Sequence, residues 1–339
     1  MQEILRTENL MIGYQQGREK KVVAQQINVS LQAGELVCLL GPNGAGKSTL
    51  MRTLSGSQQP LDGQVFLEGT VIHEMHARQL AKKLSLVLTE RVQAGMLTAY
   101  EVVALGRYPH TNWTGKLSAK DHEIIQWSIQ MAGANELADR ILSELSDGER
   151  QKIMVARALA QEPSIMILDE VTAFLDLPRR VEIMQLLRKL AHDANKAILL
   201  STHDMDLALR SADRLWLLPK GAELQVGAPE DLILNGAFEQ AFASEGVTFN
   251  RHSGAFHIQQ HYDQNVELLG EGEAALWTRR ALEREGLAIV AQASLKIEVK
   301  IDSNSSTWFL HDNSSLEQFS SIYQLILGLR QKRALTESL

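Results

Sequence analysis

A glycine-rich loop between an apolar run and a helical segment constrains the fold of this chain more than any other feature. Residues 35–40 predict a buried strand, and the loop that follows is Gly41-Pro42-Asn43-Gly44-Ala45-Gly46-Lys47-Ser48-Thr49. It matches G-x-x-x-x-G-K-[ST], in which backbone N–H groups cradle phosphates, the lysine reaches the β/γ oxygens and the hydroxyl binds Mg²⁺. A glycine-rich turn that happens to precede Lys-Ser is the alternative. The strand before the loop and the helix predicted over 49–54 favour a nucleoside triphosphate site, because a helix N-terminus attracts anions.

Length and composition are those of a soluble protein with two domains. The chain has 339 residues, of which 45% are hydrophobic and 22% charged, and a single core seldom grows beyond about 250 residues. The net charge of −7 argues against nucleic acid as a partner, since binding to a phosphate backbone needs clustered Lys and Arg. We therefore expect one large and one small domain.

The same sequence predicts a cytoplasmic location. Its one cysteine, Cys38, lies in the predicted strand before the loop, which indicates a core position and a reducing compartment. No stretch approaches the roughly 20 apolar residues that cross a bilayer, and residues 1–6 lack a signal-peptide pattern. If the chain works at a membrane, another polypeptide must supply the spanning helices.

Apolar patterning predicts an α/β core. Short apolar runs at 165–168 and 197–200 alternate with helical segments at 148–160 and 179–192, which is typical of a parallel sheet. Residues 214–218 with the following glycines predict a hairpin.

Other parts of the chain have a different character. Residues 3–64 predict a mixed β layer of short strands broken at Gly13, Gly17 and Gly34. A helical insertion is predicted at about 92–160. From residue 251 to 339 we expect a separate α+β domain, with strands at 266–269, 287–290, 295–301 and 307–310 and helices at 273–285 and 315–329.

Two carboxylates follow a predicted buried strand. Asp169 and Glu170 come directly after 165–168, and a strand end is where such groups meet a bound triphosphate. Asp169 suits the shell of Mg²⁺, which prefers hard oxygen ligands, and Glu170 suits a general base that activates water. Without the phosphate-binding loop, a surface Asp-Glu pair would be the default interpretation.

Together with these features, the segment Leu145-Ser146-Asp147-Gly148-Glu149-Arg150-Gln151 resembles the signature motif of ATP-binding cassette (ABC) ATPases. The resemblance implies a P-loop NTPase cassette, with ATP and Mg²⁺ as ligands and the signature of one subunit touching the γ-phosphate held by another. Ser146, Gly148 and Glu149 would then contact ATP across a homodimer. Considered alone, Ser146 and Glu149 form a capping box at a helix start, and both interpretations can hold together.

The resemblance assigns further roles. It implies that Tyr14 stacks on adenine, that Asp176 belongs to a loop communicating across the dimer, and that His203 contacts the γ-phosphate beside the catalytic Glu170 and Lys47. The other implied ATP contacts are Gly41, Asn43, Gly44, Ala45, Gly46, Ser48 and Thr49, with Ser48 and Asp169 also holding Mg²⁺.

The chain departs from the family pattern at several positions. Glu90 stands where a glutamine usually senses the metal and the attacking water, and we expect it to ligate Mg²⁺ with altered coupling to a partner. Asp147 replaces a glycine, Glu149 a frequent glutamine, and Val171 a common proline. These changes leave the predicted triphosphate chemistry intact.

The segment 103–110, Val-Ala-Leu-Gly-Arg-Tyr-Pro-His, resembles ATPases that power uptake of iron chelates (siderophores), haem and cobalamin. It implies an importer subunit attached to the cytoplasmic face of the membrane, with integral-membrane permease subunits and, indirectly, an extracytoplasmic substrate-binding protein as partners. A loop in which Gly106 and Pro109 merely set a turn is the local alternative. An exporter ATPase, a soluble cassette acting on ribosomes or DNA, and a regulatory module without turnover are the alternatives for the whole chain.

The resemblance covers roughly the first three quarters of the chain. For the C-terminal domain we weigh a ligand-sensing role against a role in dimer stability or packing, and favour the latter. His257 and His261 have an i, i+4 spacing that suits metal ligands on a helix. Residues 255–258 look more like a strand, which favours a structural or solvated role for both.

Overall fold

The computed structural model of the chain describes residues 2–17, 19–88, 95–242, 247–250, 255–258, 264–302, 305–312 and 315–337. By their contacts the residues divide into two compact units, Met1–Ala243 with Phe249–Ala255, and Ser244–Thr248 with Phe256–Leu339. No helix among the described residues is long and apolar enough to cross a membrane.

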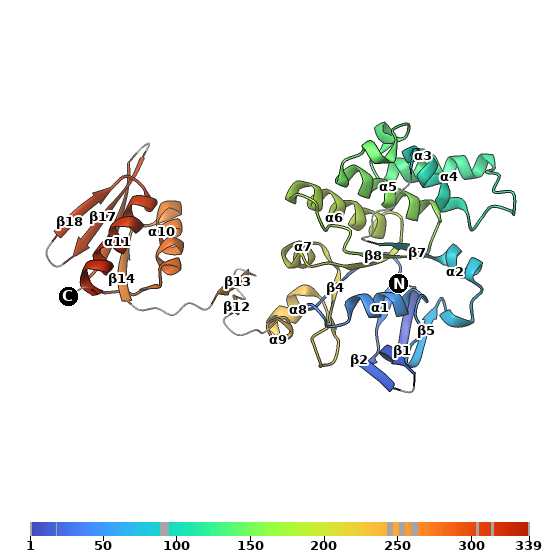
Figure 1. Ribbon diagram of the computed structural model, residues 1–339, viewed down its shortest axis with the longest axis horizontal. Coiled ribbons are helices and arrows are strands. Elements are labelled where there is room, and N and C mark those ends of the chain that lie inside the picture. Colours follow the sequence, from blue (N-terminus) through green and yellow to red (C-terminus); the bar gives the residue numbers. More distant parts are fainter. Residues whose placement is uncertain are drawn as a thin grey trace. The chain divides into compact units, whose positions relative to one another are not determined.

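The first unit is drawn in blue to yellow in Figure 1. Its strands are β1 (Glu3–Gln16), β2 (Glu19–Ile27), β3 (Ser30–Gln32), β4 (Leu36–Leu40), β5 (Asp62–Leu67), β6 (Thr70–Val71), β7 (Leu84–Val87), β8 (Ile165–Asp169), β9 (Ala197–Ser201), β10 (Arg214–Leu217) and β11 (Gln225–Gly227). Its α-helices are α1 (Lys47–Leu54), α2 (Ala77–Lys83), α3 (Ala99–Ala104), α4 (Ala119–Met131), α5 (Asp147–Ala160), α6 (Leu177–His192), α7 (Met205–Ser211), α8 (Pro229–Leu234) and α9 (Ala237–Ala241). Short 3₁₀ helices include η2 (Leu105–Arg107), η3 (Asn135–Leu137) and η4 (Leu142–Glu144).

The central sheet of this unit carries the parallel strands that the alternating pattern predicts. Its order is β11-β10-β4-β9-β8-β7, parallel throughout except for the antiparallel β10–β11 pair. Strand β8 is buried on both faces because α6 lies on one side of the sheet, while α1 and the N-terminal strands lie on the other (Figure 1). This confirms the parallel-sheet core and the hairpin predicted at 214–218. Cys38 is fully buried in β4, and burial raises the pKa of its thiol to about 12.

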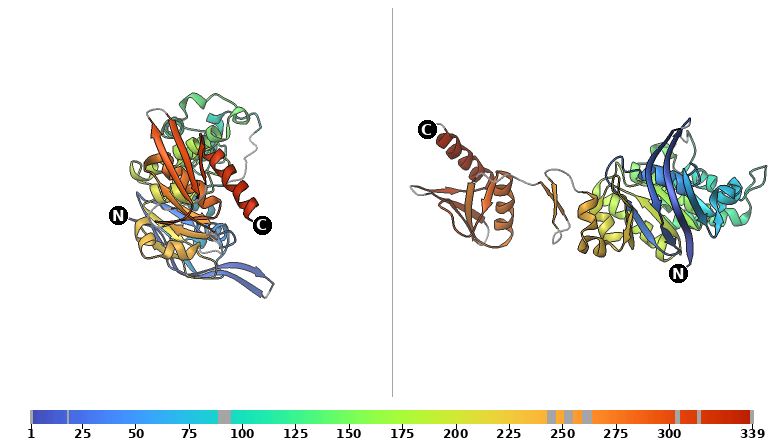
Figure 2. Two further views of the ribbon diagram at one scale, coloured as in Figure 1. Left: turned by 90° about the vertical axis from the view of Figure 1, so that its left-hand side faces the viewer. Right: turned by 90° about the horizontal axis from the view of Figure 1, so that it is seen from below.

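The N-terminal strands form the predicted mixed β layer, with one difference. They pair in the order β2-β1-β5-β6, and β3 pairs with β1. The prediction that Gly13 ends a strand is wrong: β1 runs through it, and a Cβ there would lie 2.2 Å from the Lys21 carbonyl oxygen of β2. Glycine at this position therefore permits a close approach of two strands rather than a turn. Figure 2 shows the resulting long β1–β2 hairpin extending beyond the rest of the unit.

Helices α3, α4 and α5 share a second hydrophobic core. Its buried side chains run from Ala99 to Ala160 and include Val103, Ile125 and Ile153. Each helix begins with a capping box, at Thr98, Ser118 and Ser146, which fixes where the three helices start. We call residues 95–160 the helical subdomain.

The second unit has its own core between a sheet and two helices. Its elements are β14 (Gln264–Leu269), α10 (Gly272–Arg284), β15 (Leu287–Ile289), β16 (Lys296–Asp302), β17 (Ser305–Asp312), β18 (Ser315–Phe319) and α11 (Ile322–Glu337). The sheet order is β15-β14-β16-β17-β18, and side chains such as Ile297, Trp308 and Leu325 form the core. This is the α+β arrangement expected from the sequence.

One element of this unit was predicted wrongly. Residues 315–319 form strand β18, paired antiparallel with β17, where the sequence predicted a helix from residue 315. The helix α11 begins only after Ser321, whose hydroxyl accepts a bond from the Gln324 N–H. Strand β12 (Val247–Asn250) pairs with β13 (Ala255–Ile258), so the strand predicted at 255–258 is confirmed. His261 lies outside the described residues.

Candidate functional site

The loop Gly41–Thr49, which we call the phosphate loop, joins β4 to the N-terminus of α1. Gly46 precedes α1 with a φ of 107°, a left-handed conformation that favours glycine. A Cβ at Gly41 would lie 2.3 Å from the Leu218 carbonyl oxygen, so this position also requires glycine. The backbone of the loop can therefore approach a ligand closely at the start of a helix.

Lys47 bends back over the phosphate loop. Its Nζ donates hydrogen bonds to the carbonyl oxygens of Gly41 (2.8 Å) and Pro42 (3.4 Å). Burial lowers the pKa of this amine, and the carboxylates of Glu170 and Asp169 partly offset that effect. The ammonium group is thus held among backbone oxygens and next to two acidic groups.

A pocket of about 390 Å³ opens over the phosphate loop. Nine residues predicted from the sequence line it: Tyr14, Asn43, Gly44, Gly46, Lys47, Ser48, Thr49, Glu170 and His203. Tyr14, 43% exposed, has its hydroxyl 2.9 Å from Thr49 Oγ1. Lys21 and Val23 of β2 also line the pocket and were missed. The register of the β1–β2 hairpin could have indicated Lys21, because this residue pairs directly with Tyr14.

Strand β8 delivers the two predicted carboxylates to this region. Asp169 is paired in register with Ser201 of β9, and burial, followed by the neighbouring Glu170 charge, raises the pKa of its carboxyl group. Glu170 has a φ of 51°, which is unusual for a residue with a side chain and is found at functional sites. His203 Nε2 lies 2.7 Å from Glu170 Oε1. The histidine and the proposed base are therefore in direct contact at the pocket wall.

The signature segment Leu145–Gln151 does not line this pocket. Ser146 caps α5, and its N–H and hydroxyl both donate to Glu149 Oε2, at 2.9 and 2.8 Å, which confirms the capping box. Asp176 caps α6 in the same way by accepting a bond from the Arg179 N–H (3.2 Å). Neither Ser146, Gly148, Glu149 nor Asp176 is among the residues around the phosphate loop.

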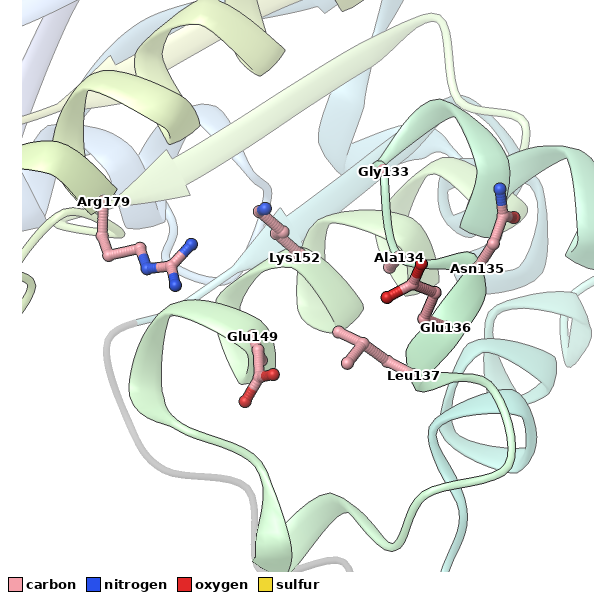
Figure 3. A pocket seen from close by; sticks show the side chains of 8 residues that line it. All are labelled: Gly133, Ala134, Asn135, Glu136, Leu137, Glu149, Lys152 and Arg179. Carbon is pink, nitrogen blue, oxygen red and sulfur yellow. The ribbon is translucent and has the colours of Figure 1, made fainter.

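Glu149 lines a second pocket instead, of about 340 Å³ (Figure 3). In Figure 3 the side chains of Glu149, Lys152 and Arg179 lie on one side and residues 133–137 on the other. Lys152 and Arg179 both pair with Glu182 of α6, at 3.0 and 2.9 Å. The pocket thus lies where the start of the signature helix meets the start of α6.

Two further predictions have different outcomes. Glu90, proposed as a metal ligand, lies outside the described residues. In the segment 103–110, Gly106 does more than set a turn, because a Cβ there would lie 2.2 Å from the Arg157 carbonyl oxygen of α5. Arg107 is buried, with 3% exposure, and was not predicted as a contact residue.

Comparison with known proteins places these motifs in context. Residues 24–173 match the family profile described as ABC transporter, and residues 263–330 match the iron ABC transporter C-terminal domain. An uncharacterized ABC transporter ATP-binding protein of Methanocaldococcus jannaschii is 41% identical, over 78% of this chain and 90% of that protein. The iron(3+)-hydroxamate import ATP-binding protein FhuC of Bacillus subtilis is 35% identical, over 70% and 87%. The cobalamin import ATP-binding protein BtuD of Halobacterium salinarum is 30% identical, over 79% and 69%.

A solved structure is similar in fold. The dimeric structure of the bacterial ABC transporter cassette MJ0796 matches with a TM-score of 0.58 and 27% identity. The match covers 67% of this chain and 99% of that one.

Proposed function

This chain belongs to the ATP-binding proteins of the ABC transporter family, and from that membership we propose that it is the ATP-hydrolysing subunit of an importer for an iron chelate or cobalamin. Relatives named for hydroxamate and cobalamin import support this cargo class, as does the match of residues 263–330 to an iron-transporter C-terminal domain. Haem stays a prediction from the segment 103–110. An exporter or a soluble cassette would share the same nucleotide pocket. The proteins that bind the chain, rather than its ATPase chemistry, therefore distinguish these alternatives.

The observation that carries the ATPase proposal is the meeting of the phosphate loop with Glu170 and His203 in one pocket. Phosphoryl transfer needs positioning and charge stabilisation more than covalent chemistry. We infer that Lys47 and the loop amides hold the β/γ-phosphates, that Tyr14 stacks on adenine, and that Glu170 accepts a proton from the attacking water. His203, which contacts Glu170 at 2.7 Å, would hold this carboxylate and reach the γ-phosphate.

The residues at the end of β8 also fit a magnesium ion. Asp169 offers a hard oxygen ligand whose pKa is raised by burial and by the adjacent Glu170, and a dication would relieve both effects. We propose that Asp169 and Ser48 hold Mg²⁺, with Glu90 as a third candidate from the sequence. The ion would neutralise charge on the phosphates during transfer.

The signature segment implies a second chain at the site. Because Ser146 and Gly148 do not line the chain's own phosphate pocket, we propose that they complete the pocket of a partner cassette. The similar cassette MJ0796 was solved as a dimer, which supports this arrangement. Asp176, which caps the N-terminus of α6, would lie at the same interface.

For a cassette importer, the remaining partners are a permease and an extracytoplasmic binding protein. We propose that the chain is attached peripherally to the cytoplasmic face of the membrane through the permease. The exposed side chains Leu105, Tyr108 and Trp113 at the helical subdomain, exposed by 53%, 78% and 95%, are the proposed contact surface. Solvent-exposed aromatic and aliphatic groups in one segment are typical of interaction sites.

The ATPase proposal is tested with Glu170→Gln. We expect kcat to fall by about 100-fold or more, because a general base contributes that much, while ATP binding and ATP-driven dimerisation persist. The measurements are phosphate release and size-exclusion chromatography with ATP. Normal turnover by the variant would refute the assignment of the base.

The transport proposal needs a separate experiment. The tagged chain is affinity-purified from gently solubilised membranes of its host, and its companions are identified by mass spectrometry. A polytopic permease is the expected partner. Ribosomal or DNA-repair proteins in its place would favour the soluble alternative.

A further inference from the structure

The turn between the signature helix α5 and strand β8 is bound by side chains or backbone groups from several other elements. Lys196, just before β9, donates to the Pro163 carbonyl oxygen (2.8 Å), and the Ser164 N–H donates to the Lys83 carbonyl oxygen of α2 (2.8 Å). The Gln161 side chain donates to the Leu84 carbonyl oxygen (2.6 Å) and to that of Ala81. The turn 160–164 is therefore fixed to the central sheet and to α2.

The same turn is also bound to the segment 105–111. Arg107 Nη1 donates to the Ala160 carbonyl oxygen (2.6 Å) and to Glu162 Oε2 (2.8 Å). His110 Nε2 lies 2.9 Å from the Gln161 carbonyl oxygen. Gly106 leaves no room for a Cβ against α5, so this contact is made at backbone distance.

Arg107 itself joins three elements. Its side chain is 3% exposed, and Nε donates to Asp121 Oδ1 at the start of α4 (2.9 Å), while Nη1 reaches the end of α5. The hydroxyl of Ser118, together with its N–H and Arg107, holds the pKa of Asp121 at about 2, so this carboxylate is charged at neutral pH. A planar guanidinium can make these directed bonds at once, and lysine cannot.

Three large side chains close to Arg107 in the sequence are exposed. Leu105 and Tyr108, one on each side in sequence, are 53% and 78% exposed, and Trp113 is 95% exposed. Leu105 and Tyr108 thus belong to the segment 105–111, whose Arg107 and His110 are bonded to the turn 160–164, and Trp113 follows that segment directly. From that turn, α5 leads back to Ser146 and β8 leads forward to Asp169 and Glu170.

We propose that Arg107 is a positioning residue that couples the contact surface of Leu105, Tyr108 and Trp113 to the ATPase site through the turn 160–164. From this turn the coupling would reach Ser146 through α5, and Asp169 and Glu170 through β8. This inference rests on the proposed function, because it requires a permease that binds this surface. Arg107 touches neither nucleotide nor the reacting atoms. Its role is to make the segment 105–111, α4 and the end of α5 move as one body when the permease moves.

The test uses Arg107→Lys in the full chain, reconstituted in lipid with the permease that co-purifies with it. ATPase activity is measured with and without the permease. We expect unchanged basal activity and a loss of stimulation by about fivefold or more, the range of an energetic coupling between two sites. Arg210→Lys is the matched control, since Arg210 makes an exposed pair with Asp206 and should keep full stimulation.

A second variant guards against misfolding. Glu162→Gln removes one partner of Arg107 at a position whose side chain is 41% exposed, and it should lower stimulation in the same direction. Full stimulation in both variants, or a parallel loss of basal and stimulated activity, would overturn the proposal. If Arg107→Lys does not fold, Glu162→Gln decides. Failure of the wild-type chain to respond to the permease would instead refute the proposed function.

Discussion

Glu149 places a negative charge beside Ser146, where the proposed site has to bind the negatively charged γ-phosphate of ATP. Its carboxylate oxygen Oε2 accepts hydrogen bonds from the N–H and the hydroxyl of Ser146, the residue proposed to bind the partner's γ-phosphate, and Oε1 accepts one from Arg140 Nη1 at 3.2 Å. The Ser146 hydroxyl, followed by its N–H, lowers the pKa of Glu149. The group is therefore charged at neutral pH, and only substitution removes its charge. An internal carboxylate thus occupies donors that a phosphate would use.

We expect Glu149→Gln to lower the ATP concentration for half-maximal hydrolysis by about two- to fivefold, the size of a single-charge effect at a helix N-terminus. The amide oxygen can still accept from Ser146, so the cap and the melting temperature should be retained. The measurement is the ATP dependence of phosphate release. Glu144→Gln removes the same charge from an exposed neighbour that does not bond Ser146. Equal shifts in both variants would contradict a specific role for Glu149.

Residues whose role depends on a local motif could be predicted from the sequence, and those whose role depends on register or tertiary contact could not. The phosphate loop, Asp169, Glu170 and His203 follow from short patterns after buried strands. Lys21 enters the pocket only because β2 pairs with β1 in one register. Arg107 is buried because groups from α4 and α5 surround it, and no spacing in the sequence reveals that.

At the scale of elements, the error at residues 315–319 has a local cause. In the structure the exposure of this stretch has the period of a strand, with Leu316 and Gln318 exposed and their neighbours half-buried. The sequence Ser321-Ile322-Tyr323-Gln324 has the form of a capping box and marks a helix start at 322. The start of the helix could therefore have been predicted, whereas the strand could not, because Ser315-Leu316-Glu317-Gln318-Phe319 lacks apolar/polar alternation and its pairing with β17 is a tertiary contact.

The packing of the segment 105–111 on α5 leads to a prediction for the helical subdomain. Gly106→Ala places a Cβ 2.2 Å from a backbone carbonyl oxygen, which must move, so we expect destabilisation of about 1–3 kcal/mol. The free energy of unfolding is measured by urea denaturation. Gly227→Ala in β11 is the control, because its nearest contact is the flexible Leu232 side chain at 3.1 Å. A smaller loss for Gly106→Ala than for Gly227→Ala would contradict the close packing.

The whole molecule contains separate hydrophobic cores in its two units. Core residues of the second unit run from Val266 to Leu329, and the matched C-terminal domain spans 263–330. The sequence change near residue 250 led us to place the domain boundary at 250/251, which stays a prediction. Phe249, however, packs on Phe238 of α9 with ring centroids 4.9 Å apart, and it is 7% exposed. The chain just before 250 therefore contributes to the cassette.

These contacts predict how far the chain can be shortened. A chain ending at residue 262 keeps Phe249 and should hydrolyse ATP at the rate of the full chain, because every residue proposed for the nucleotide site precedes it. In that shortened chain, Phe249→Ala should lower the free energy of unfolding by about 3–5 kcal/mol, since a buried aromatic ring is lost from contact with Phe238, which itself packs on Phe242. Phe309→Ala in the full chain is the control, because it removes a half-buried ring from the second unit and should leave the cassette transition in place. If the shortened chain failed to fold, the cassette would depend on residues beyond 262, and the two units could not be independent domains.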